Sequence, residues 1–257
     1  MDTNQSKKHG MSSEKASRVK TRGNRKEDIF ARLINGMVFR GTEKSDVINP
    51  YRQLFSIKGS SEKKGGDGKD GRIQIFQYRK SRFEKKEKDF PAGDIINKIF
   101  DCYPPTYDEY QNNKEQVKNN VAVFMEELKN FLLNEENKRL FLNRAVFSTN
   151  VDFFVVYDDD IFHIFDKEDV LNTFIKNLEV DNSSTKQKVV LKYKKICMEI
   201  EMRTTNDGKY PTIFIPSTKS VLMGLLTETI KEQKKFDNTI WLYGNAIKKY
   251  KHYLPKI

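Results

Sequence analysis

Asp46 and Lys58 are the two residues whose types and spacing most clearly suggest chemistry. They lie near the two ends of the stretch Lys44-Ser-Asp-Val-Ile-Asn-Pro-Tyr-Arg-Gln-Leu-Phe-Ser-Ile-Lys58. A carboxylate is a ligand that Mg²⁺ accepts together with phosphate and water, and a lysine ammonium is a compact charge that can hold a water or a phosphate oxygen. A divalent cation activates water and neutralises charge on a phosphorane. The pair therefore predicts metal-dependent hydrolysis of a phosphodiester.

The segments around this pair are predicted to bring the two side chains together. Val47-Ile48 and Leu54 to Lys58 are typical of short strands, and Pro50 predicts a turn between them because proline cannot continue a ladder. Side chains alternate across a strand, so one face of the second strand carries Lys58 and can also receive Asp46 from its neighbour. We expect a hairpin in which the carboxylate and the ammonium converge.

Ser45-Asp46 followed by Ser56-Ile57-Lys58 resembles the PD-(D/E)XK signature of type II restriction endonucleases and Holliday-junction resolvases. The usual proline before the first Asp is Ser45 here, and the usual acid two residues before the lysine is Ser56, so the motif is one carboxylate short. In some restriction enzymes of this superfamily a serine occupies that place and a helix elsewhere supplies the acid. The resemblance implies a Mg²⁺ ligand at Asp46, a water-positioning Lys58 and a backbone or hydroxyl contact from Ser56.

The missing acid has two candidates. Arg22-Gly-Asn-Arg-Lys-Glu27 resembles the helix opening that places a glutamate in the site of many members, which implies a metal ligand at Glu27. Helical spacing puts Glu27 on the same face as apolar residues up to Ile34. Alternatively, Asn24-x-x-Glu27 forms a capping box in which the glutamate only satisfies a backbone amide. Glu84 is the second candidate, although its basic neighbours indicate a solvated face.

The composition favours a polyanionic partner. The 257 residues include 47 Lys and Arg against 36 Asp and Glu, which gives a formal net charge of +11. Such a field attracts nucleic acid, although a Lys-rich composition also follows from AT-rich coding. Cys102 and Cys197 stand far apart without metal-ligand spacing, so neither disulfides nor a zinc site is predicted and a reducing cytoplasm fits. No segment approaches the roughly 20 apolar residues of a membrane span.

The apolar patterns predict a mixed α/β fold without internal repeats. Helices are expected over 24–35, 91–101, 115–134 and 170–178, and strands over 153–157, 161–165, 189–202 and 212–215, with a turn at Asp158-Asp159-Asp160. Residues 73–78 fit either a strand or the start of a helix. Residues 1–21 are expected to form a disordered basic arm. The resemblance implies a restriction-endonuclease-like core sheet flanked by helices over 22–145, with 146–257 adding β-hairpins, completing the sheet and supplying DNA contacts in one compact domain.

A second resemblance lies in the distal half. Met198 to Arg203, Asn206 to Lys209 and Ile213 to Pro216 are similar to the C-terminal strand pair of several small restriction endonucleases. That similarity implies DNA contacts at Arg203 and Lys209, whereas the alternative is an ordinary hairpin with a basic edge. The basic run from Arg79 to Arg82 adds two further predicted DNA contacts at its ends.

The resemblances imply a type II restriction enzyme that cuts double-stranded DNA at a specific sequence with Mg²⁺. The family leads us to expect a homodimer and a cognate DNA methyltransferase. Two alternatives stay open, namely a structure-specific repair or junction nuclease and a non-catalytic basic nucleic-acid-binding protein.

Overall fold

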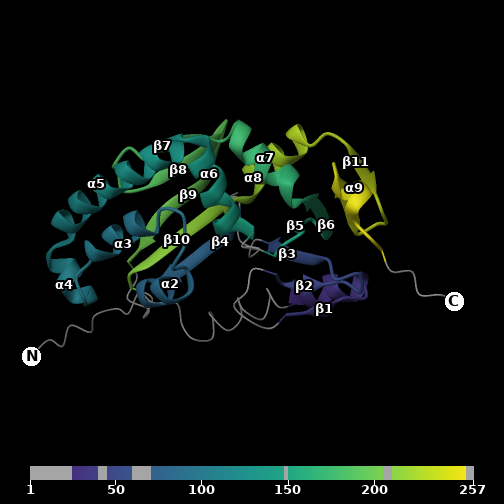
Figure 1. The fold of residues 1–257 in the computed structure, drawn as a ribbon, viewed down its shortest axis with the longest axis horizontal. Coiled ribbons are helices and arrows are strands. Elements are labelled where there is room, and N and C mark those ends of the chain that lie inside the picture. Colours follow the sequence, from purple (N-terminus) through teal and green to yellow (C-terminus); the bar gives the residue numbers. More distant parts are fainter. Residues whose placement is uncertain (1–24, 40–44, 60–70, 148–149, 205–209, 253–257) are drawn as a thin grey trace, which may run out of the picture.

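Two β-sheets frame the structure, and each takes strands from both halves of the chain (Figure 1). The computed structural model describes residues 25–39, 45–59, 71–147, 150–204 and 210–252. The fold is mixed α and β, as the sequence patterns predict.

The seven-stranded sheet carries the predicted hairpin. Its strands in spatial order are β1 (Met37–Val38), β2 (Val47–Ile48), β3 (Leu54–Gly59), β5 (Phe153–Asp158), β6 (Ile161–Asp166), β12 (Ile240–Tyr243) and β11 (Gln233–Lys235). β1, β2 and β3 are antiparallel neighbours, whereas β3 and β5 run parallel. β5 and β6 form an antiparallel hairpin, and β12 lies parallel to β6. The C-terminal ends of β3 and β5 therefore lie side by side at the same end of the sheet.

The five-stranded sheet is antiparallel throughout. Its order is β4 (Arg72–Arg79), β10 (Thr212–Thr218), β9 (Lys195–Arg203), β8 (Val189–Tyr193) and β7 (Glu179–Asn182). The region 189–202, expected to be strand, forms two strands, because Lys194 adopts a left-handed φ of 57° and turns the chain between β8 and β9.

Helices surround the sheets and fill the space between them. A helix over residues 25–33 precedes α2 (Lys80–Lys86), α3 (Gly93–Asp101), α4 (Tyr107–Asn112), α5 (Lys114–Leu133), α6 (Glu135–Leu142), α7 (Lys167–Asn177), α8 (Lys219–Thr229) and α9 (Ala246–Lys249), with a π-helical turn at Asn143–Phe147. α3 and α5 cover one face of the five-stranded sheet, and α7 and α8 lie between the two sheets (Figure 1). None of the helices within the described residues is long and apolar enough to cross a membrane.

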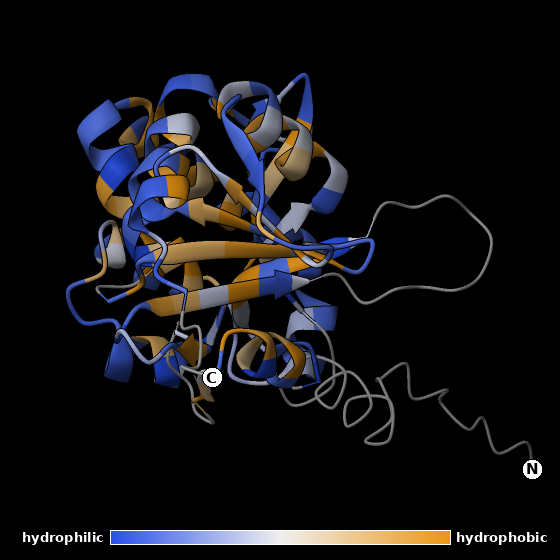
Figure 2. Cartoon of the chain, turned by 90° about the vertical axis from the view of Figure 1, so that its right-hand side faces the viewer, coloured by the Kyte–Doolittle hydropathy of each residue, from blue (hydrophilic) through white to orange (hydrophobic). Residues whose placement is uncertain are grey.

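Apolar periodicity explains where these elements pack. The stripe of α5 recurs every three or four residues and is buried against the five-stranded sheet at Val117, Val121, Met125, Leu128 and Leu132. Apolar residues accordingly gather on the central strands and on the inner sides of the helices, with hydrophilic residues outside (Figure 2).

A separate apolar cluster packs between the helix over residues 25–33 and one face of the seven-stranded sheet. Phe30 on the helix over residues 25–33 is fully buried, with its ring centroid 5.3 Å from that of Phe55 on β3 and 4.9 Å from that of Phe162 on β6. Phe55 in turn stacks on Phe153 of β5 at 5.1 Å. This cluster holds the N-terminal helix against the strands that carry the predicted hairpin.

Replacing Phe30 by Ala is expected to lower the free energy of unfolding by about 3–5 kcal/mol, because the ring leaves a cavity between helix and sheet. Ile29, the preceding residue, is 36% exposed, so Ile29→Ala serves as a matched control with a change of about 0.5 kcal/mol or less. Urea unfolding measures both. Equal losses for the two variants would contradict the packing described.

Candidate functional site

The β2–β3 pairing places Asp46 directly opposite Ser56. Val47 pairs with Phe55 and Ile48 with Leu54, and the backbone N–H of Asp46 donates to the carbonyl of Phe55 at 2.8 Å. Val47 and Phe55 both lie in the cluster that contacts the N-terminal helix. Because side chains alternate, Asp46 projects to the other face of the sheet.

The carboxylate of Asp46 and the ammonium of Lys58 meet on that face. Asp46 Oδ2 lies 3.7 Å from Lys58 Nζ and accepts a hydrogen bond from the backbone N–H of Ile57 at 2.6 Å. The side chains of Lys58 and Asp46 are only 12% and 19% exposed. The predicted convergence of this acid and this lysine is therefore observed, with a backbone donor that fixes the direction of the carboxylate.

Ser56 adds a buried hydroxyl to the same face. Its residue is fully buried, and its Oγ has no hydrogen-bond partner among the described residues. Buried hydroxyls are nearly always paired with protein or water. A water or ligand atom near the Asp46–Lys58 pair would satisfy this one.

The two other acids are placed differently. The helix that carries Glu27 packs through Phe30 and Ala31 onto the face of the sheet opposite Lys58. The backbone of Glu27 therefore lies on the other side of the sheet from Lys58. Asn24 of the alternative capping box lies outside the described residues. Glu84 lies on α2 with its side chain 47% exposed, 3.9 Å from Lys80 Nζ, on the solvated face that its neighbours indicate.

The donors around Asp46 fit a magnesium ion only in part. Within the described ranges, no group of three or more His, Cys, Asp or Glu side chains could hold a metal ion. Mg²⁺, however, commonly takes one or two carboxylates and completes its shell with substrate phosphate and waters. Both contacts of the Asp46 carboxylate fall on Oδ2, so coordination through Oδ1 would leave them in place.

The turn between β2 and β3 is held by the C-terminal segment. Asn49 Oδ1 accepts from the N–H of Gln53 at 2.9 Å, and Asn49 Nδ2 donates to the carbonyl of Lys251 at 3.0 Å. Gln53 Nε2 donates to the carbonyl of Lys249 at 2.8 Å, while its Oε1 accepts from the N–H of Lys251 at 2.9 Å. Residues 196 and more apart in sequence thereby fix the hairpin.

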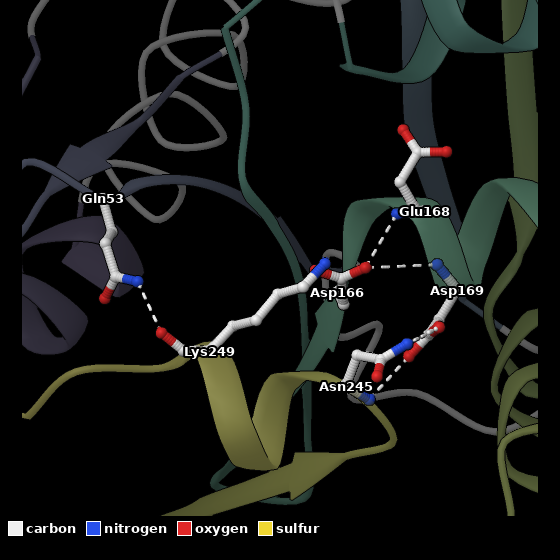
Figure 3. A network of polar contacts seen from close by, with 6 residues as sticks. All are labelled: Gln53, Asp166, Glu168, Asp169, Asn245 and Lys249. Carbon is white, nitrogen blue, oxygen red and sulfur yellow. Dashed lines mark hydrogen bonds and ion pairs between the residues drawn. The ribbon is translucent and has the colours of Figure 1, made fainter.

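That C-terminal segment is itself anchored to the start of α7 (Figure 3). Asp166 caps α7 by accepting from the N–H of Glu168 at 3.1 Å, and its other oxygen accepts from Lys249 Nζ at 2.8 Å. This hydrogen bond raises the pKa of Lys249 above its ordinary value. Asp169 accepts from both the N–H and Nδ2 of Asn245 at 2.7 Å. The hairpin, α9 and α7 thus form one connected polar network.

The predicted DNA contacts gather at one end of the five-stranded sheet. Arg79 and Arg203 both pair with Thr212, so they flank it on neighbouring strands. The guanidinium carbon of Arg203 lies 3.3 Å from the ring centroid of Phe214. Arg79 is the last residue of β4 and Arg72 is the first. The end of the sheet that carries Arg79 and Arg203 therefore lies about 23 Å from Arg72, at 3.3 Å per residue.

The two remaining predicted contacts have different outcomes. Arg82 lies on α2, beside this end of β4, with its guanidinium carbon 5.5 Å from the ring centroid of Tyr78. Lys209 lies outside the described residues.

The C-terminal end of β3 and β5 gathers charged groups that the sequence analysis does not assign to the site. Lys58 pairs with Val156, so Asp158 follows two residues later on the same face. Asp158 forms an ion pair with Lys219, the first residue of α8. Alternation along β5 places Asp158 on this face, but the sequence holds no signal for Lys219, since α8 is not predicted.

His163 lies two strands from Lys58 on this face, because it pairs with Val156. Its Nδ1 lies 2.9 Å from the hydroxyl of Tyr243. Burial lowers the pKa of His163 below its ordinary value of 6.5, while Asp158 and Asp159 act in the opposite direction and Lys219 lowers it further. The imidazole is therefore neutral at pH 7.

A separate hollow of about 340 Å³ lies between α7, the end of α8 and the segment after β12. Asp169, Thr173, Lys176, Ile230 and Asn245 are among its lining residues. None of the residues predicted for catalysis or DNA binding lines it.

The chain matches no protein-family model, and no curated protein or solved structure is significantly similar to it.

The depressed pKa of His163 predicts a loss of stability in mild acid. The unfolded chain binds a proton near pH 6.5 while the folded protein resists it, so the free energy of unfolding falls as the pH drops below 6.5 toward the folded pKa. His163→Asn, which keeps a polar atom for Tyr243, should lack this component. Urea unfolding at intervals from pH 8 to pH 5 measures it. Parallel stability curves for the two proteins would contradict the prediction.

Proposed function

We propose that this protein is a Mg²⁺-dependent endonuclease that hydrolyses phosphodiester bonds of double-stranded DNA at a specific sequence, in the manner of a type II restriction enzyme. The observation that carries the proposal is the approach of Asp46 Oδ2 to within 3.7 Å of Lys58 Nζ on adjacent strands. An acid and a lysine so placed support the resemblance of this segment to the PD-(D/E)XK signature.

Each residue of the site has a distinct role in this proposal. Asp46 would hold the cation, and the N–H of Ile57 keeps the carboxylate in one direction. Bound Mg²⁺ supplies an activated water and charge neutralisation. Lys58 positions that water or steadies the phosphate as a point charge. The Ser56 hydroxyl, which lacks a partner among the described residues, is available to a water at the site. Asp46 is the metal-binding carboxylate of this proposal, because Glu27 lies on the helix that covers the opposite face of the sheet.

The order of the elements also supports the proposal. A helix over residues 25–33, three antiparallel strands and a later strand, β5, that runs parallel to the third form one continuous sheet. The acid precedes the second strand and the lysine lies on the third. A helix followed by an antiparallel hairpin that carries the acid and the lysine is what the resemblance to the PD-(D/E)XK signature leads us to expect.

The charge and the arginines support DNA as the substrate. The net charge of +11 favours binding to a polyanion, and the neighbouring Arg79 and Arg203 offer two guanidinium groups at one end of a sheet. Arginine is suited to phosphate and to the edge of guanine. For a palindromic target we propose a two-fold dimer in which each subunit cuts one strand, and a cognate methyltransferase as its partner in the cell.

Replacing Lys58 by Ala is expected to abolish Mg²⁺-dependent cleavage of plasmid DNA, because the attacking water is no longer positioned. DNA binding should stay within a few-fold of the parent, because only one of many basic side chains is lost. Lys195→Ala, an exposed lysine on β9, is the matched control and should keep full cleavage. Agarose gels with Mg²⁺ or a chelator measure cleavage, and fluorescence anisotropy measures binding.

The outcomes separate the proposed enzyme from its alternatives. If the parent protein binds DNA but never cuts it with Mg²⁺, the protein is a non-catalytic binding protein and the proposal is wrong. Digestion of unmethylated plasmids into discrete bands indicates sequence recognition, whereas cutting confined to branched DNA identifies a junction nuclease.

A further inference from the structure

We propose that Lys219 is a second phosphate-binding residue of this site, which contacts the DNA backbone beside the phosphate held at Asp46 and Lys58, and that Asp158 is the counterion that DNA displaces from it. This inference rests on the proposed function, since it assigns a further contact to the same substrate.

The strand register places Asp158 next to the site. β3 and β5 run parallel with Lys58 beside Val156 and Gly59 beside Tyr157, so Asp158 extends the same face beyond the end of β3. Side chains at diagonal positions on one face are within reach of long groups. A nucleic acid that touches Lys58 at this end of the sheet therefore passes the Asp158–Lys219 pair.

Lys219 reaches this place from the other sheet. It follows β10 as the first residue of α8, and its backbone N–H donates to the carbonyl of Gly71 at 3.0 Å, just before β4. Its ammonium pairs with Asp158 Oδ1, and the side chains of Lys219 and Asp158 are 20% and 26% exposed. The pair is thus more accessible than Lys58, at 12%.

The start of α8 favours an anion. The helix has eleven residues, no acidic residue in its first turn, and an N-cap residue, Thr218, whose side chain makes no capping hydrogen bond. A lysine at the positive end of a helix dipole is unfavourable unless an anion lies close by, and helix N-termini with a nearby cation are suited to phosphate. Asp158 supplies that negative charge in the structure, and a phosphate would supply it in the complex.

Two further polar groups lie near this strand end. Ser56 Oγ, on the same face, is fully buried and has no partner among the described residues. On the opposite face, Lys26 Nζ lies 4.5 Å from the ring centroid of Tyr157 and close against Gly59, where an added Cβ would be 2.9 Å from it. Ammonium groups therefore flank the last residues of β3 and β5 on both faces.

The alternative role of the Asp158–Lys219 pair is to tie the two sheets together. In that case removing either partner affects stability alone. Phosphate binding predicts instead that the two residues act in opposite directions on DNA affinity, because Lys219 attracts the phosphate while Asp158 competes with it.

The experiment measures the affinity of the full chain for a fluorescent 30-base-pair DNA duplex of mixed sequence, by anisotropy, with a chelator present to prevent cutting. Lys219→Ala should weaken binding several-fold more than Lys195→Ala and reduce the slope of log K against log salt by about 0.9. Lys219→Arg should restore that slope.

Asp158→Asn should tighten binding more than Asp159→Asn does. Asp159 is the neighbouring exposed acid at φ 45°, a conformation that asparagine tolerates, so its variant makes the same change of charge without touching Lys219. If Lys219→Ala is too unstable to assay, this comparison alone decides the matter.

The results distinguish this inference from the proposed function. If the parent binds and cuts DNA but the variants at 158 and 219 bind like their matched controls, Lys219 is structural and only this inference fails. If the parent neither binds nor cuts DNA, both fail. Opposite shifts for Lys219→Ala and Asp158→Asn, each beyond its control, support it.

Discussion

The hydrogen bond from the N–H of Ile57 to Asp46 Oδ2 is the interaction on which the arrangement of the site depends. β2 and β3 share only two paired positions, so the backbone ladder has little length with which to fix the residue just before β2. The side chain of Asp46 takes the place of a further ladder acceptor. The N–H of Ile57 fixes the direction of the Asp46 carboxylate. The ammonium group of Lys58, the residue after Ile57, approaches that carboxylate to 3.7 Å.

The opposite face of the same strand supplies the rigidity. Phe55 is fully buried between Phe30, Phe153 and Tyr250, with ring centroids 5.3, 5.1 and 6.1 Å away. Aromatic packing of this kind resists rotation of the strand, because any slip of one residue would expose these rings and turn Lys58 to the wrong face. The apolar face and the charged face of β3 are therefore two consequences of one register.

The sequence predicts the parts of this arrangement that depend on local spacing. Alternation and a proline are enough for the β2–β3 hairpin, and a stripe with a period near 3.6 residues is enough for α5. Asp46 directly precedes β2 and Lys58 stands on β3 of the same hairpin, so their approach follows from the register alone.

Contacts between distant segments could not be predicted in this way. Lys219 meets Asp158 across 61 residues because α8 packs between two sheets, and no local pattern determines that packing. The helix of Glu27 was expected at its observed place in the chain, but the sequence does not say which face of the sheet it covers.

The two ion pairs near the C-terminal ends of β3 and β5 differ in how readily an anion can displace the carboxylate from the lysine. Asp46 and Lys58 are shielded and share their carboxylate oxygen with a backbone N–H, so separating them leaves buried groups unpaired. Asp158 and Lys219 are more accessible, with 26% and 20% of their side chains exposed, so a phosphate can approach this ammonium more readily. In the proposed complex, DNA therefore displaces Asp158 from Lys219 and contacts Lys58 while the Ile57 N–H keeps the direction of the Asp46 carboxylate.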